Sequence, residues 1–322
     1  MTETLFHAYT PLVVWTGLGL LLFRFVPKAL PRLLGRTLYW VGVPLQILAL
    51  ARRTNFSEGM GLALIVTVTA LLLGLTLAWI SLLLFKQLFN KHLKRDVPVE
   101  RLSCFQEKSW QGSFILSSIL GNTGFVGLAI APLLVSDRVL NLVVFYSVAQ
   151  NIIGTYGIGV FIASYFGHQH DEINWWIQIR DVLRVPSLWA FIFGILTHSV
   201  ELPAVLESGL QTSLGLVIAS AFLLMGIRLA QIQGWKSFQM ALIPSLLKVV
   251  VLPSIVGIGT TLIGLPPDAR LALVLMSGMP TAFAGIILAE EYDLNRELIA
   301  SSIVMTVGLL LLIIPLWLVL LD

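Results

Sequence analysis

Long apolar runs separated by short polar stretches make up most of this chain of 322 residues. About 20 consecutive apolar residues are enough to cross a bilayer as a helix. Ten such runs lie near residues 5–26, 36–51, 60–85, 112–135, 139–166, 185–200, 209–230, 238–263, 270–289 and 298–321. They are too continuous for the alternating pattern of a transmembrane β-barrel. The pattern predicts an all-α membrane protein with ten transmembrane helices, or nine if one of the two short runs, the second or the sixth, does not cross.

Composition agrees with this assignment. Hydrophobic residues make up 57% of the chain and charged residues only 11%, and the mean hydropathy is +0.91. Soluble domains carry about 25% charged residues, so this chain has too few charged residues to cover a surface that faces water. The net charge of +3 arises from basic residues in short loops, which predicts no nucleic-acid partner. The single cysteine, Cys104, excludes an intrachain disulfide. The N-terminus lacks the positive region of a cleaved signal peptide, so we expect the first span to be retained.

The distribution of basic residues predicts the orientation. Loops on the cytoplasmic side of a membrane protein carry an excess of lysine and arginine. If the N-terminus lies outside, fifteen of the twenty basic residues fall in inside loops. The opposite loops hold Arg52, Arg53, Arg138 and Arg270, and Lys248 lies within a span. We therefore expect an integral protein of the plasma (inner) membrane with both termini extracytoplasmic.

The chain divides into two halves of five spans. The polar stretch 167–184 follows the fifth span and is the expected cytoplasmic connector between a first repeat, 1–166, and a second repeat, 185–322. Because five crossings is an odd number, the second copy starts from the opposite face. The arrangement is therefore two inverted five-helix repeats.

The fourth and ninth spans each contain a cluster of helix-weakening residues. The first cluster is Gly121-Asn122-Thr123-Gly124-Phe125-Val126-Gly127, and the second is Ser277-Gly278-Met279-Pro280-Thr281-Ala282. Glycine in a helix costs about 1 kcal/mol relative to alanine, and proline about 3 kcal/mol. Opened backbone at membrane depth is tolerated only inside protein or beside a water-filled cavity. Matching interruptions in two halves are typical of a transporter binding site, and they predict broken crossover helices four and nine. The alternative is that such residues only shape helix packing, as we expect for the other prolines of the spans.

The two interruptions bring positively polarised helix N-termini toward the middle of the membrane, together with several polar side chains. This field suits an anionic group. Two polar residues of other spans are further candidates. Lys248 costs about 2.5–3.5 kcal/mol at a helix centre. It either serves a substrate, or it extends to the membrane interface or pairs with carbonyls of a broken helix. Gln150 either lines the cavity or makes an ordinary interhelical hydrogen bond, and Asn151 and Gln46 present the same choice.

Several functions are not supported by the sequence. None of the seventeen acidic residues lies at the centre of a span, so exchange of cations through a buried carboxylate is not expected. No phosphate-binding P-loop and no nucleophile–base constellation occur, which predicts neither ATP-driven transport nor an enzyme. His168 and His170 lie in a loop and are interpreted as solvated residues rather than metal ligands.

Several segments resemble the auxin efflux carrier family of membrane transporters over nearly the whole chain. They are Gly121–Leu128, Leu224-Met225-Gly226-Ile227-Arg228-Leu229, Ser277–Ala282, Leu288–Asp293 with Glu297–Ala300, and Val43-Pro44-Leu45. The resemblance implies inverted repeats, with helices one, two, six and seven as a scaffold and the others as a transport domain. It also implies organic anions as substrates and a homodimer. The family's crossover asparagine corresponds to Asn122 and its crossover proline to Pro280. The chain departs from plant members because no proline lies beside Asn122 and because the long cytoplasmic loop is missing, which favours a compact bacterial-type member.

The sequence therefore predicts a secondary transporter that moves a small organic anion, such as an auxin-like or other carboxylate, by alternating access. A membrane sensor or scaffold that binds a ligand without transporting it is the alternative. Neither cofactor nor metal is expected, and the partners are the substrate and the lipid bilayer. The predicted substrate-binding residues are Asn122, Thr123, Gly124, Gln150, Lys248, Gly278, Pro280 and Thr281.

Overall fold

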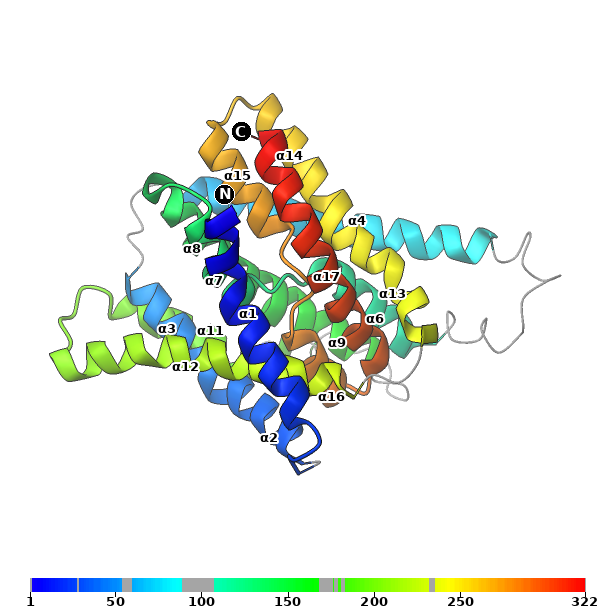
Figure 1. The fold of residues 1–322 in the computed structure, drawn as a ribbon, viewed down its shortest axis with the longest axis horizontal. Coiled ribbons are helices and arrows are strands. Elements are labelled where there is room, and N and C mark those ends of the chain that lie inside the picture. Colours follow the sequence, from blue (N-terminus) through cyan, green and yellow to red (C-terminus); the bar gives the residue numbers. More distant parts are fainter. Residues whose placement is uncertain are drawn as a thin grey trace.

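A computed structural model describes residues 2–27, 29–53, 60–88, 107–167, 183–231 and 235–321, together with Trp176, Ile179 and Arg180. Within these residues the elements are all helical (Figure 1). Six helical stretches are long and apolar enough to cross a membrane, and three shorter apolar helices accompany them. The prediction of an all-α integral membrane protein is confirmed, and helical segments lie in each of the ten predicted ranges. The expected connector, 167–184, lies mostly outside the described residues.

The described part of the first half of the chain contains helices and shorter helical turns. They are α1 (Thr2–Leu22), α2 (Leu30–Thr37), η1 (Leu38–Gly42), α3 (Val43–Arg53), α4 (Met60–Leu88), α6 (Lys108–Ile119), η4 (Thr123–Gly127), α7 (Leu128–Ile130), η5 (Ala131–Leu133), η6 (Asp137–Val139), α8 (Leu140–Ala149), η7 (Gln150–Gly159) and α9 (Val160–Gly167).

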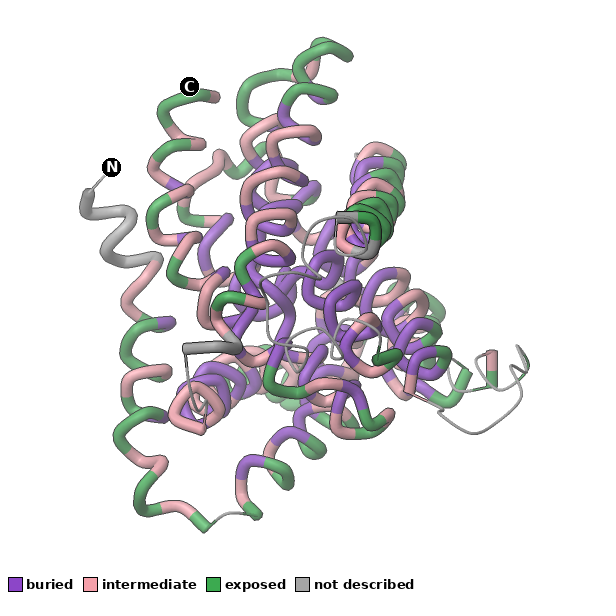
Figure 2. The backbone as a smooth tube through the Cα atoms, turned by 90° about the vertical axis from the view of Figure 1, so that its right-hand side faces the viewer, coloured by how far each residue is buried: buried purple, intermediate pink, exposed green. Residues whose placement is uncertain are grey.

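The described part of the second half is also helical. Its elements are α11 (Pro186–Leu196), α12 (Ala204–Leu229), α13 (Trp235–Leu246), η8 (Leu247–Val251), α14 (Leu252–Leu262), α15 (Pro267–Ser277), α16 (Ala284–Glu291) and α17 (Arg296–Leu321). In Figures 1 and 2 the start of α1 and the end of α17 lie at the same end of the molecule.

Two of the π-helical turns have a local cause in the sequence. Pro44 follows η1 and Pro253 follows η8, in each case as the second residue after the turn. Proline has no N–H group to donate to the carbonyl four residues earlier. The residue before each proline donates instead to the carbonyl five residues earlier, from Val43 to Leu38 and from Leu252 to Leu247. Such π-turns widen a helix and often occur at functional sites.

The helices pack in two groups. In one, which we call the scaffold group, α1 packs against α12, α11 against α3, and α12 against both α2 and α3. In the other, which we call the crossing group, α13 packs against α17, α4 against α8, α14 against α15, and α6 against α9 and α17. The groups meet where α12 contacts α17 and η4, α3 contacts α8, and α11 contacts η7.

Small residues allow α1 and α12 to touch along their backbones. A Cβ atom placed on Gly19 would lie 2.2 Å from the Leu223 carbonyl oxygen, and one on Gly226 would lie 2.0 Å from the Thr16 carbonyl oxygen. Close backbone approach through glycine is a common way for helices to associate in lipid, where apolar burial provides no driving force. Gly226 belongs to the Leu224–Leu229 motif, so part of that motif serves helix packing.

Burial shows which helix surfaces face lipid. In Figure 2 the buried residues gather in the middle of the molecule and exposed residues lie on the outer helix faces. Large apolar side chains are exposed on these faces, among them Leu21 at 72%, Leu196 at 74%, Val205 at 80% and Leu312 at 73%. Apolar surface on this scale is typical of contact with hydrocarbon rather than water.

Candidate functional site

Both predicted helix interruptions are present, and they pair directly with each other. Helix α6 ends at Ile119, and helical structure resumes at Thr123; α15 ends at Ser277, and helical structure resumes at Ala284. The Asn122 N–H donates to the Pro280 carbonyl at 2.7 Å, and the Ala282 N–H donates to the Leu120 carbonyl at 2.8 Å. These bonds form an antiparallel bridge between Gly121 and Thr281, and we call this region the crossing.

Two helix N-termini open at the crossing. The segment Thr123–Leu133 begins directly after Asn122, whose side-chain oxygen accepts a hydrogen bond from the Phe125 N–H at 3.3 Å. Helix α16 begins directly after Phe283. The first N–H groups of a helix have no acceptor within it, so both ends carry partial positive charge.

The two helix C-termini at the crossing are capped by side chains. Toward α6, the Thr281 hydroxyl donates to the Ser117 carbonyl at 2.9 Å, and the Gln150 amide donates to the Ile119 carbonyl at 3.2 Å. Toward α15, Nζ of Lys248 donates to the Ser277 carbonyl at 2.6 Å. All three donors are buried, so the capping is built into the protein interior.

A small cavity lies between the crossing and the scaffold group. Its volume is about 20 Å³, room for roughly one water molecule, so this conformation is closed around the site. The residues lining it include both helix N-termini and a set of aromatic and aliphatic side chains. They are Leu38, Val43, Gln46, Gly121, Asn122, Gly124, Phe125, Asn151, Tyr156, Ala282, Phe283, Ala284 and Ile287.

Gln46 joins the scaffold group to the crossing. Its side-chain amide donates to the Gly124 carbonyl at 2.7 Å, and the side chain is buried. Asn151 lies on the other side of Gly124, where its own amide donates to the Ser147 carbonyl at 2.8 Å. A Cβ atom on Gly124 would lie only 3.0 Å from Nδ2 of Asn151, so glycine is needed for this close approach.

The eight predicted site residues divide into three sets. Asn122 and Gly124 line the cavity. Gln150, Lys248 and Thr281 instead hold helix C-termini, as the alternative interpretation of Lys248 and Gln150 expected.

The remaining three predicted residues shape the backbone of the crossing or lie within it. Pro280 contributes its carbonyl to the bridge, and Gly278 packs against Pro253, with a Cβ position 3.2 Å away. Thr123 is fully buried, and its hydroxyl has no hydrogen-bond partner among the described residues.

Three cavity residues were underestimated or missed by sequence reasoning. Gln46 and Asn151 ranked below the crossover residues, and Tyr156 was not considered. Tyr156 is buried and meets the ring of Tyr39 edge to face at 5.6 Å, which closes the cavity on the side of η1. The available signal was weak: Tyr156 lies between Gly154 and Gly157, after the polar residues Gln150 and Asn151 of the same span.

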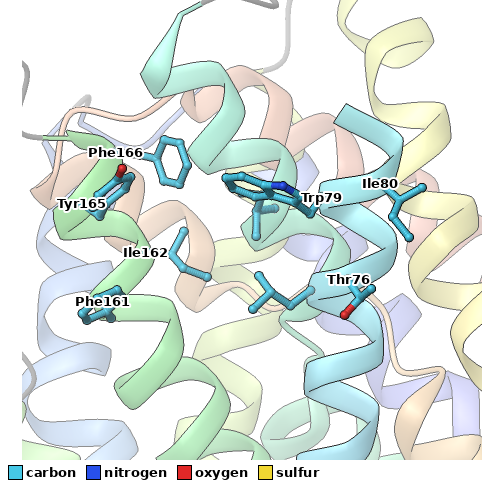
Figure 3. Close-up of a pocket in the computed structure, with 9 residues that line it drawn as sticks. Thr76, Trp79, Ile80, Phe161, Ile162, Tyr165 and Phe166 are labelled. Carbon is cyan, nitrogen blue, oxygen red and sulfur yellow. The ribbon is translucent and has the colours of Figure 1, made fainter. Parts of the chain in front are cut away.

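Two larger hollows lie away from the crossing. An apolar groove of about 470 Å³ opens between α4 and α9 and contains Trp79, Phe161 and Tyr165 (Figure 3). A more polar vestibule of about 380 Å³ is lined by Arg228, Gln231, Ile286, Glu290, Arg296, Glu297 and Ala300. In the vestibule, Arg228 of α12 forms an ion pair with Glu290 of α16, so this pair connects the scaffold group to the crossing group.

Paired helix interruptions in the interior of an apolar helical protein define a class of membrane transport proteins with discontinuous helices. The chain belongs to the membrane transport protein family, the auxin efflux carrier family, whose model matches residues 5–318.

Two archaeal proteins are similar to the chain. An uncharacterized transporter of Methanocaldococcus jannaschii is 26% identical over 211 residues, which cover 64% of this chain and 67% of that protein. An uncharacterized transporter of Methanothermobacter thermautotrophicus is 24% identical over 214 residues, which cover 65% of this chain and 67% of that protein.

Proposed function

We propose that the chain is a secondary carrier that moves a small organic anion across the membrane by alternating access, with its substrate held at the crossing. In this proposal all ten helical ranges cross the bilayer, as two inverted repeats in residues 1–166 and 185–322. The observation that carries the proposal is the pairing of the two interruptions beside a cavity that contains two helix N-termini. Membership of a transporter family supports it independently.

The chemistry of the cavity favours a carboxylate with an apolar body. The N–H groups that open Thr123–Leu133 and α16 are suited to bind the oxygens of an anion. Phe125, Phe283 and Ile287 surround them and suit a hydrocarbon or aromatic portion. The unpaired hydroxyl of Thr123 is a further donor near these amides.

Transport requires the two helix groups to move relative to each other, because a cavity of about 20 Å³ cannot hold an organic acid. Two contacts join the groups. One is the bond from Gln46 to Gly124, and the other is the ion pair of Arg228 with Glu290. We expect both to break when the cavity opens, as in carriers where one group of helices moves against another around a fixed site.

Flux of labelled organic acids into proteoliposomes tests the function. We expect uptake of at least one member of a panel of aromatic monocarboxylates and aliphatic dicarboxylates. Gly124→Ala places a methyl group 3.0 Å from Asn151 at the cavity wall. Uptake should fall about tenfold or more, because one extra methylene group in a hydrophobic pocket changes enzyme selectivity by at least that factor. Gly308→Ala is the matched control, because nothing lies within 4 Å of that Cβ position.

Two results would contradict the proposal. Equal uptake by the wild type and by the double variant Asn122→Ala/Pro280→Ala would remove the crossing as the substrate site. A panel member that raises the melting temperature of purified protein, while the protein shows no uptake of it, would favour the ligand-binding sensor instead.

A further inference from the structure

Lys248 is a buried lysine whose amino group lies beside both interruptions. Its side chain is 2% exposed and lies in the π-turn η8. Nζ donates to the carbonyl of Ser277, the last residue of α15. In the described part of the chain no carboxylate lies within ion-pair distance of it. A buried charge needs a compensating partner, and here the partner is the carbonyl end of a helix.

The ammonium group also lies beside the first interruption. A Cβ atom on Gly121 would lie 3.1 Å from Nζ and 3.2 Å from Cε of Lys248. The absence of a side chain at Gly121 therefore makes room for the ammonium group at the crossing itself. Lys248 is thus in contact with both interrupted helices, through the end of α15 and the backbone that follows α6.

In carriers with discontinuous helices, unwound carbonyls and half-helix C-termini bind the coupling metal ion. The distance of 2.6 Å from Nζ to the Ser277 oxygen also falls in the range over which carbonyl oxygens hold hard metal cations. The other C-terminus at the crossing, that of α6, is occupied by the neutral donors Thr281 and Gln150. Both carbonyl ends are therefore filled by side chains of the protein.

We propose that the Lys248 ammonium group is a tethered counter-cation, which occupies the carbonyl end of α15 in place of a coupling metal ion. Carriage of an anion through this crossing then requires no co-bound sodium or other metal cation. The inference rests on the proposed function for its consequence in transport, but the occupancy of the α15 end by Lys248 is a separate claim and can be measured without substrate.

Thermal unfolding of purified protein in sodium, lithium, potassium and choline chloride at equal ionic strength tests the occupancy. The wild type should melt at the same temperature in all four salts. Lys248→Ala opens the carbonyl end, so sodium or lithium should raise its melting temperature in a saturable manner relative to choline. Lys248→Met, which keeps a similar length but has no donor for the Ser277 carbonyl, should respond in the same direction. Lys108→Ala is the control, since Lys108 is exposed and its loss should create no salt specificity.

Specific stabilisation of the wild type by one metal cation would overturn the proposal, as would two folded Lys248 variants that respond to none. If Lys248→Ala does not fold, the methionine variant and the wild type still decide the question. In proteoliposomes, wild-type uptake should be equal in sodium and choline salts, and uptake by Lys248→Ala in choline should fall about tenfold. Salt-specific melting of the variants without any uptake would leave the cation claim intact and would reject the carrier.

Discussion

At the scale of single residues, donors that satisfy helix carbonyls help to hold the crossing together. Thr281 shows this most clearly, because its two polar groups bind two different helices. Its hydroxyl donates to Ser117 of α6, and its N–H donates to the hydroxyl of Thr306 in α17 at 3.0 Å. Sequence reasoning selected Thr281 as a substrate ligand, and the structure gives it these structural bonds as well.

Thr281→Val should therefore destabilise the protein. It removes the donor and leaves the buried Ser117 carbonyl unsatisfied, which costs about 1–3 kcal/mol. The measurement is the melting temperature of purified protein in detergent. Thr76→Val is the matched control: Thr76 also donates to a carbonyl, that of Leu72 in its own helix, but it is exposed, so the change should be small. Equal melting temperatures for wild type and Thr281→Val would show that this bond is dispensable.

At the scale of helices, the sequence predicted the interruptions well because glycine and proline weaken a helix wherever they occur. It did not predict that both π-turns of Pro44 and Pro253 would bring side chains to the crossing. Gln46 follows Pro44 and Lys248 precedes Pro253, and both reach carbonyls of the interrupted helices. Both prolines were visible in the sequence. The directions of the Gln46 and Lys248 side chains, however, depend on the widened turns and on the neighbouring helices.

The contact between α1 and α12 leads to a prediction about helix packing. Gly226→Ala should force these helices apart, because the added Cβ would lie 2.0 Å from the backbone oxygen of Thr16. We expect a lower melting temperature and a lower yield of folded protein, since overpacking costs about 1–3 kcal/mol or more. Gly209→Ala lies on the same helix with nothing within 4 Å and is the control. If both variants melt like the wild type, the close approach of α1 and α12 is not needed for stability.

At the scale of the whole molecule, we expect the contacts between the two helix groups to keep the cavity closed. The ion pair of Arg228 and Glu290 is largely buried, with side-chain exposures of 16% and 13%, and it joins the groups. A second pair, Arg36 with Glu291, also joins α2 to α16, but its exposures are 56% and 62% and its closest atoms are 3.9 Å apart. Exposed pairs contribute little, whereas loss of one partner of a buried pair is costly.

Reactivity of a cysteine at the cavity measures this closure. In a Cys104→Ser background, Asn122→Cys should react slowly with a maleimide, since the cavity holds no more than about one water. Adding Glu290→Gln removes the buried pair, so opening should be more frequent and the reaction faster. Adding Glu291→Gln should leave the rate unchanged. A rate that does not respond to Glu290→Gln would show that the pair does not hold the cavity closed.

Sidedness is also a property of the whole molecule. The start of α1 and the end of α17 lie at one end of the structure, in agreement with an even number of crossings (Figures 1 and 2). From the distribution of basic residues we expect both termini outside. Epitope tags at either terminus should be accessible to antibody on cells with an intact inner membrane. If both tags are accessible only after permeabilisation, the orientation is opposite to the one predicted. If only one of the two tags is accessible on intact cells, the number of crossings is not even.

The sequence by itself determined the class of protein, the helical ranges and the positions of the two interruptions, because hydrophobic length and the backbone cost of glycine and proline are local properties. The tertiary structure alone decided which side chains meet at the crossing. Hydrogen bonds such as Lys248 to Ser277 and Gln46 to Gly124 join residues 29 and 78 positions apart. A buried donor must bind whichever carbonyl the packing places beside it, and only the assembled helices specify that neighbour.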